Sequence, residues 1–274
     1  MKLAIVSDEI SYDFREAINY GKKWGLHYFE LRNLITGRVP YIARDEIDQI
    51  FDVKSEFGIT ISSISPGLFE ISLQQEEQLK KELEEKIYDS FRFAAMLGTR
   101  DIIISGFKRY DGEPQHNFSQ ILHILQRMAV LAEKYGFKLL IENHADSWCD
   151  TAENMTKVLE SIDSKALRAY WNPGNSFAAG EIPYPYGYLT VRKHIYSLHV
   201  KDARRMDSVT KWVPIGQGEV DWEGQFHAIM HGVDLKYITI QAQNGPFVEA
   251  SKYNVEQVLD LLKDYKLSDE QIIR

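Results

Sequence analysis

A chain of 274 residues, 44% of them hydrophobic, can bury a large core without dividing into two domains. Its formal net charge of -8 argues against a nucleic-acid binder, because affinity for the phosphate backbone depends on clustered lysine and arginine. The sequence contains no run of about 18 apolar residues of the kind that spans a membrane, and its single cysteine cannot form an intrachain disulfide. We therefore expect a cytoplasmic protein that binds small molecules or other proteins.

Strand and helix patterns alternate along the chain. Apolar runs typical of buried parallel strands occur at residues 3–6, 28–32, 60–65, 102–105, 138–142, 167–171, 195–200 and 237–242. Helices are predicted from Asp13 to Gly25 and at residues 44–57, 74–97, 118–135, 151–161, 222–231 and 254–262. The Pro- and Tyr-rich run at residues 182–188 makes the sixth helix the least defined.

Capping residues mark the ends of these helices. Asp13 and Asp150 each have a glutamate three residues later, which is typical of a capping box, and Asp221 is a further N-cap candidate. Gly58 and Gly98 follow predicted helices where a left-handed residue is favoured. Eight strand-helix units predict an α/β fold, a single (β/α)8 barrel over residues 1–274. An open doubly wound sheet is the alternative, disfavoured because no Gly-rich phosphate loop follows the first strand.

The strand at residues 138–142 ends abruptly in polar residues. Because side chains alternate along a strand, Glu142 and His144 point to the same face. Other polar residues at strand ends are Glu30, Arg32, Ser65, Ser105, Asn172, His199, Lys201, Gln241 and Gln243. In a parallel barrel these ends meet at the mouth where active sites form. The alternative for any one of them is a solvated rim residue or an ion pair such as Glu30 with Arg32.

Four segments resemble a known family. IENH at residues 141–144, WNPGN at 171–175, HVKD at 199–202 and IGQGEVDW at 215–222 are similar to segments of the xylose isomerase-like barrels, which include sugar phosphate isomerases and epimerases. SDEIS at residues 7–11, SSISPG at 62–67 and QNGP at 243–246 also fall where that family has comparable segments. The resemblance implies a (β/α)8 fold and, in active members, one divalent ion held by Glu, Asp, His and Glu from the last four strands.

Two of the implied metal ligands differ in this chain. Glu142 matches the first glutamate and His199 the histidine, whereas Asn172 stands in place of the aspartate and Gln241 in place of the last glutamate. Asn175 stands where the family often has histidine. The family's quartet carries a charge of about -3 and this quartet about -1, and hard divalent cations prefer carboxylate oxygens. We expect Mn, Mg, Zn or Co to be held weakly at Glu142, Asn172, His199 and Gln241, or not at all.

The resemblance also implies chemistry. Two-base epimerisation needs two groups that take and give protons, and Gln241 cannot do so. We therefore expect an isomerase-type enzyme in which Glu142 moves a proton next to a carbonyl, with Lys201, His199 or a metal stabilising the enediolate oxygen. The expected substrate is a sugar, sugar phosphate or cyclic polyol. The candidate substrate-binding residues are Glu30, Arg32, His144, Asn175, Lys201 and Gln243.

Other functions stay open on the same fold. A non-catalytic carbohydrate-binding or regulatory protein would account for the amides at Asn172 and Gln241, which keep shape while removing charge. A dehydratase or lyase acting on a keto-polyol also fits one-base chemistry. An abasic-site endonuclease is the least favoured, because a zinc cluster requires several histidines and carboxylates. The sequence leaves a homo-oligomer open.

Overall fold

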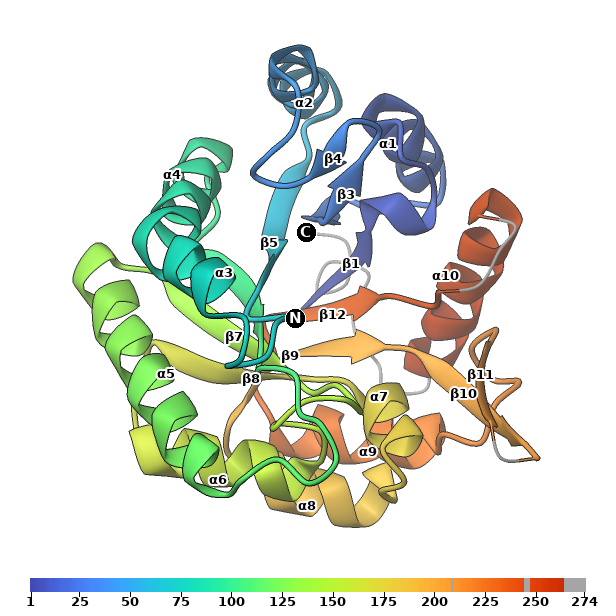
Figure 1. Ribbon diagram of the computed structural model, residues 1–274. Helices are drawn as coiled ribbons and strands as arrows, with labels where there is room; N and C mark the ends of the chain where they lie inside the picture. The colour runs from blue at the N-terminus through green and yellow to red at the C-terminus, as the bar shows by residue number, and fades with distance from the viewer. Residues whose placement is uncertain (208, 244–246, 264–274) are drawn as a thin grey trace.

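The computed structural model describes residues 1–207, 209–243 and 247–263 (Figure 1). Within these residues, eight parallel strands close into a barrel in the order β1-β12-β9-β8-β7-β6-β5-β2. The barrel strands are β1 (Lys2–Val6), β2 (Tyr28–Leu31), β5 (Thr60–Leu68), β6 (Asp101–Ser105), β7 (Lys138–Glu142), β8 (Leu167–Trp171), β9 (Ile195–Val200) and β12 (Tyr237–Ile240). The predicted (β/α)8 barrel is confirmed.

Helices surround the barrel and cover its outer face (Figure 1). The longer helices are α1 (Phe14–Lys23), α2 (Arg44–Phe57), α4 (Ile87–Leu97), α5 (His116–Tyr135), α6 (Ala152–Ile162), α9 (Trp222–Gly232) and α10 (Phe247–Lys263). The shorter ones are η1 (Ser7–Glu9), α3 (Glu76–Lys81), η2 (Glu82–Lys86), α7 (Pro173–Ala178), η3 (Pro183–Gly187) and α8 (Tyr188–Val191). None of the described helices has the length and apolar character needed to cross a lipid bilayer.

The observed elements differ from the predicted ones in a few places. The predicted helix at residues 74–97 is divided into α3, the π-helical turn η2 and α4, and the helix predicted from residue 254 already begins at Phe247. Two antiparallel hairpins were not predicted: β3 (Asn33–Leu34) with β4 (Gly37–Arg38), and β10 (Asp202–Met206) with β11 (Val209–Val213). Their strands are short or largely exposed, so they lack the apolar alternation that indicates a strand.

Most predicted caps are present. The Asp13 side chain accepts a hydrogen bond from the Glu16 backbone N–H at 3.0 Å, and Asp221 accepts one from Gly224 at 2.8 Å. Helix α6 differs from the prediction, because Thr151 rather than Asp150 accepts the backbone N–H of Asn154 in its first turn. These caps satisfy backbone donors that the first helical turn leaves free.

Polar side chains occupy the interior of the barrel near the carboxyl ends of its strands. Tyr170 on β8 reaches Glu30 on β2 and Thr239 on β12, strands that do not neighbour β8. These side chains therefore point into the barrel rather than toward the helices. Leu140 on β7 packs with Tyr170, and Glu142 lies two residues further along the same strand, so the alternation of side chains turns Glu142 to the same interior. The fold thus gathers the polar strand ends at one mouth.

Candidate functional site

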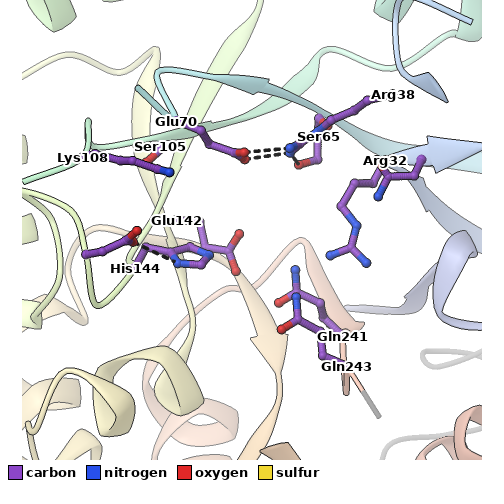
Figure 2. A pocket seen from close by; sticks show the side chains of 12 residues that line it. Arg32, Arg38, Ser65, Glu70, Ser105, Lys108, Glu142, His144, Gln241 and Gln243 are labelled. Atoms are coloured by element: carbon purple, nitrogen blue, oxygen red, sulfur yellow. Dashed lines mark hydrogen bonds and ion pairs between the residues drawn. The ribbon is translucent and has the colours of Figure 1, made fainter. Parts of the chain in front are cut away.

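A pocket of about 430 Å³ opens at the carboxyl ends of the barrel strands (Figure 2). Of the residues predicted from the sequence, Arg32, Glu142, His144, Gln241 and Gln243 line it. This volume is in the usual range for sites that hold small molecules, and its lining is mostly polar. The barrel therefore offers one polar ligand pocket where the sequence predicted a site.

Glu142 is the last residue of β7, and its carboxylate is fixed through one oxygen. Glu142 Oε1 accepts hydrogen bonds from Asn172 Nδ2 at 2.8 Å and Asn175 Nδ2 at 3.4 Å, and lies 2.8 Å from His199 Nδ1. Burial raises the pKa of Glu142, but the His199 charge and these hydrogen bonds outweigh burial and hold the pKa well below its usual range. Glu142 is therefore ionised at neutral pH.

His199 lies between two carboxylates. Its Nδ1 faces Glu142, and its Nε2 lies 3.1 Å from Glu30 Oε2. Burial lowers the pKa of His199, but the charges of Glu142 and Glu30 outweigh burial and raise it to about 9. The ring of Tyr170 packs on the imidazole, with 4.0 Å between ring centroids. The result is a buried imidazolium whose two ring nitrogens each face a carboxylate.

Lys201 follows β9 and is 1% exposed. Its Nζ donates to Gln243 Oε1 at 2.5 Å and to Asn175 Oδ1 at 3.2 Å, and lies 3.5 Å from the centre of the Trp212 ring. Burial lowers the pKa of Lys201 to about 7, although the charge of Glu142 acts in the opposite direction. Within the described residues Lys201 makes no ion pair. Gln243 separates the amine from the open pocket and lines the wall itself.

Arg32 does not pair with Glu30, so that sequence-based alternative is wrong. Arg32 Nε donates to Asp8 Oδ2 and Arg32 Nη2 to Glu9 Oε1, each at 3.0 Å. The Glu30 carboxylate points inside the barrel toward His199 instead, whereas Arg32 follows the last residue of β2 and is held by Asp8 and Glu9. Arg32 is thereby held as a fixed cation in the pocket wall (Figure 2).

The Gln241 amide lies between Arg32 and Glu142. In one amide orientation Gln241 Oε1 accepts from Asn172 Nδ2 at 3.1 Å, which leaves the Gln241 nitrogen facing the guanidinium. In the other, Gln241 Oε1 accepts from Arg32 Nη1 at 3.2 Å and its nitrogen donates to Glu142 Oε1 at 3.3 Å. The first orientation sets the Gln241 oxygen 3.3 Å from Glu142 Oε1 and its nitrogen 3.2 Å from Arg32 Nη1, whereas the second sets only its nitrogen against a like group, Asn172 Nδ2 at 3.1 Å. We favour the second, because it leaves one unfavourable contact rather than two.

The remaining wall contains charged residues that the sequence did not single out. Arg38 donates to both Glu70 oxygens at 2.7 Å and to the Ser65 backbone oxygen at 2.8 Å. Lys108 and Asp146 also line the pocket. Asp146 lies 3.6 Å from the half-exposed His144, which the sequence did predict. Most of these residues lie in loops or short hairpins beyond the strand ends, where no periodic pattern marks them.

The predicted site residues form two layers. Arg32, Glu142, His144, Gln241 and Gln243 line the pocket. Beneath them lie Glu30, Asn172, Asn175, His199 and Lys201, all of which are buried. Four residues of the second layer contact Glu142 or Gln243, and the fifth, Glu30, contacts His199. The structure therefore brings the predicted residues together but leaves half of them to position the others.

The four predicted metal ligands are adjacent, but their arrangement does not fit a divalent ion. Both ring nitrogens of His199 face carboxylates. Asn172 Oδ1 accepts from the Asn175 backbone N–H at 3.0 Å, so the NH2 group of Asn172, not its oxygen, faces Glu142. A cation at this point would meet hydrogen-bond donors rather than oxygen ligands. Among the described residues, no three or more His, Cys, Asp or Glu side chains are grouped to hold a metal.

Comparisons with known proteins agree on the fold. A sequence model of a protein family described as the xylose isomerase-like TIM barrel matches residues 18–267. No curated protein sequence matches the chain.

Three solved structures illustrate the likeness. The zinc-bound IOLI protein has 15% identity and a TM-score of 0.80, covering 97% of this chain and 100% of that one. D-allulose 3-epimerase from Methylomonas sp., in complex with D-allulose, has 14% identity and a TM-score of 0.77, with 97% of each chain covered. A xylose isomerase-like TIM barrel protein from Mycobacterium smegmatis, in complex with magnesium, has 16% identity and a TM-score of 0.73, covering 92% and 89%.

Proposed function

Since the chain belongs to the xylose isomerase-like TIM barrel family, we propose that it is an isomerase-type enzyme acting on a small sugar, sugar phosphate or cyclic polyol. One observation carries this proposal. Glu142 Oε1 is fixed by four donors, the Gln241 amide among them, whereas Glu142 Oε2 accepts no hydrogen bond from the described residues and belongs to a carboxylate that lines the pocket. A buried, ionised and oriented carboxylate beside a polar pocket is suited to act as a general base.

The proposed reaction moves one proton next to a carbonyl. Glu142 Oε2 takes the proton from the hydroxyl-bearing carbon beside the carbonyl, the C–H electron pair forms a C=C bond, and the carbonyl oxygen becomes the negatively charged oxygen of an enediolate. Lys201 lies behind Gln243 and transfers no proton to the substrate. The neighbouring hydroxyl then passes its proton to the enediolate oxygen and becomes the new carbonyl, while Glu142 returns its proton to the former carbonyl carbon, which completes the isomerisation. Arg32 holds a positive charge at the wall that stabilises the enediolate oxygen. Gln241 has no ionisable group, so two-base epimerisation is left out of the proposal.

Exchange of the proton next to the carbonyl tests this proposal without knowledge of the product. The protein is incubated in D2O with a panel of aldoses, ketoses, their phosphates and keto-polyols, and loss of the proton next to the carbonyl is followed by NMR. We expect exchange with at least one compound class and a loss of about 1000-fold in Glu142→Gln, because general base catalysis contributes on that order. Glu133→Gln, an exposed position on α5, is the matched control. Full exchange by Glu142→Gln would show that another group is the base.

A second candidate function is a carbohydrate-binding protein without catalysis. It is favoured by the very low pKa of Glu142, because a carboxylate stabilised by several donors is a weak proton acceptor. Calorimetric titration with the same panel separates the two functions. Binding of a sugar, together with an absence of exchange in D2O for that sugar, would support the binding protein over the enzyme.

A further inference from the structure

The hydrogen bonds around Glu142 lock the orientation of two buried amides. Asn172 Oδ1 is held as the N-cap of α7 by the backbone N–H of Asn175, so Asn172 Nδ2 faces Glu142 Oε1. Asn143 holds the Asn172 backbone as well, accepting from its N–H at 2.8 Å and donating to its carbonyl at 2.9 Å. Rotating the Asn172 amide would therefore remove the cap of α7 and turn an oxygen against a carboxylate.

Asn175 is locked by a different partner. As an ammonium group Lys201 can only donate, so Asn175 Oδ1 faces Lys201 Nζ, which lies 3.2 Å away, and a turned amide would also set the Asn175 oxygen against the Asn143 carbonyl oxygen. Asn175 Nδ2 is then directed to the Asn143 carbonyl at 2.8 Å and to Glu142 Oε1 at 3.4 Å. Because both amides are buried, an amide turned the wrong way would leave polar groups without partners. Two independent sets of contacts, one at Asn172 and one at Asn175, therefore turn amide NH2 groups and not amide oxygens toward Glu142.

We propose that this network of donors takes the place of a divalent cation beside Glu142, so that the pocket works without a resident metal ion. The Asn172 and Asn175 amides and the His199 ring supply the positive ends that a carboxylate in this position requires. A metal ion could bind Glu142 Oε1 only by displacing these donors, at the cost of the α7 cap and of an acceptor for Lys201, and Glu142 Oε2 alone would offer it a single ligand. The proposal is separate from the proposed reaction, because metal binding is measured without a substrate.

Metal titration of the intact protein tests this directly. After treatment with a chelator, Mn²⁺ is added and free Mn²⁺ is measured by electron paramagnetic resonance, and Zn²⁺ is titrated by calorimetry. We expect no stoichiometric binding by the wild type below about 1 mM, since a single available carboxylate oxygen is a poor site for a hard cation. Binding of one ion per chain at micromolar concentration that is lost in Glu142→Gln would overturn the proposal.

A second test replaces the amides of Asn172 and Gln241 with carboxylates and measures whether the protein gains metal binding. In Asn172→Asp one carboxylate oxygen can keep the cap of α7 while the second faces Glu142, and Gln241→Glu adds a second carboxylate. We expect the double variant to bind one Mn²⁺ per chain roughly 100-fold more tightly than the wild type. Asn172→Ser, which keeps a capping oxygen without adding charge, is the control and gains no binding.

Folding of the variants is checked by circular dichroism. A folded double variant that gains no Mn²⁺ affinity would show that the amides do not decide metal binding, and would overturn the proposal. If the double variant does not fold, the single variant Asn172→Asp is tested instead, and we expect its Mn²⁺ affinity to be about 10-fold higher than that of the wild type. The metal titration of the wild type needs no variant, so its result stands whether or not the double variant folds.

Discussion

The protonation of the buried His199 ring depends on its partner Glu30. Its carboxylate and that of Glu142 are acceptors, so the imidazole between them must donate from both ring nitrogens to satisfy both contacts. Ser63 Oγ also donates to Glu30 Oε2, at 3.2 Å. A buried carboxylate with these partners supports His199 and, through it, the orientation of Glu142.

We predict that Glu30→Gln lowers the free energy of unfolding by about 2 kcal/mol, because a buried charged hydrogen bond to His199 is lost and an amide donor can then face a ring donor. Urea unfolding of the wild type and variant measures the difference. Glu133→Gln, at an exposed position of α5, serves as control and should change stability by less than about 0.5 kcal/mol. An unchanged midpoint for Glu30→Gln would mean that Glu30 does not support His199.

At the scale of elements, Asp202 organises the loop after the β10–β11 hairpin. Its carboxylate accepts backbone N–H groups of Ala203 at 2.8 Å, Gly216 at 2.9 Å, Gly218 at 3.0 Å and Val220 at 3.3 Å. Gly218 is required by the close approach, because a Cβ there would overlap Asp202 Oδ1 and lie 2.6 Å from the Ala203 carbonyl oxygen. The HVKD and IGQGEVDW segments are therefore parts of one structural unit.

We predict that Asp202→Asn destabilises the protein by about 2 kcal/mol, since one carboxylate oxygen becomes an NH2 group that faces backbone donors. The loop should also become susceptible to limited proteolysis between residues 214 and 221. Glu219→Gln is the matched control, because a glutamine can still accept from the Arg205 N–H. Equal proteolysis rates for the wild type and Asp202→Asn would contradict this role.

At the scale of the whole molecule, the two ends of the barrel carry different kinds of polar group. The carboxyl ends surround the pocket, whereas at the opposite end Lys236, which precedes β12, donates to Asp101 on β6 at 2.8 Å. These strands do not neighbour each other, so the ion pair crosses the end of the barrel. Asp101 is 1% exposed and burial raises its pKa, while the Lys236 side chain is 39% exposed. The pair keeps a buried carboxylate satisfied.

We predict that Lys236→Met lowers the free energy of unfolding by about 2 kcal/mol at pH 7, a value between those of buried and exposed ion pairs. Without Lys236 the pKa of Asp101 rises further above 3.8, because the cation that lowers it is gone. A carboxyl group whose pKa is higher in the folded than in the unfolded protein destabilises the fold at pH values above that pKa. The stability lost in Lys236→Met should therefore shrink as the pH falls and Asp101 takes up a proton.

Unfolding in urea at several pH values between 4 and 8 measures this pH dependence. The wild type keeps the contribution of Lys236 throughout, since burial lowers the pKa of Lys236 but Asp101 outweighs it and raises the pKa to about 12. The double variant Asp101→Asn with Lys236→Met removes the titrating group and should lose the pH dependence. A difference between wild type and Lys236→Met that stays constant with pH would contradict the prediction.

The sequence by itself determined the barrel and the ends of its strands. Apolar runs, caps and glycines are local patterns, so they predicted the eight strands and most of the helices. The division of residues 74–97 into three helical pieces and the β10–β11 hairpin were not predicted, because neither has a local apolar period. The family resemblance rested on the short segments at the strand ends, and it is confirmed over residues 18–267.

Only the tertiary structure decided which polar groups pair and which way they point. Glu30 and His199 are 169 residues apart, and their contact depends on two strands facing each other across the closed barrel. The same closure places Lys201 and Asn175 beneath the pocket wall and turns the Asn172 nitrogen toward Glu142. A sequence states that an amide stands at position 172, but which end of that amide meets Glu142 depends on the helix cap formed by the other end.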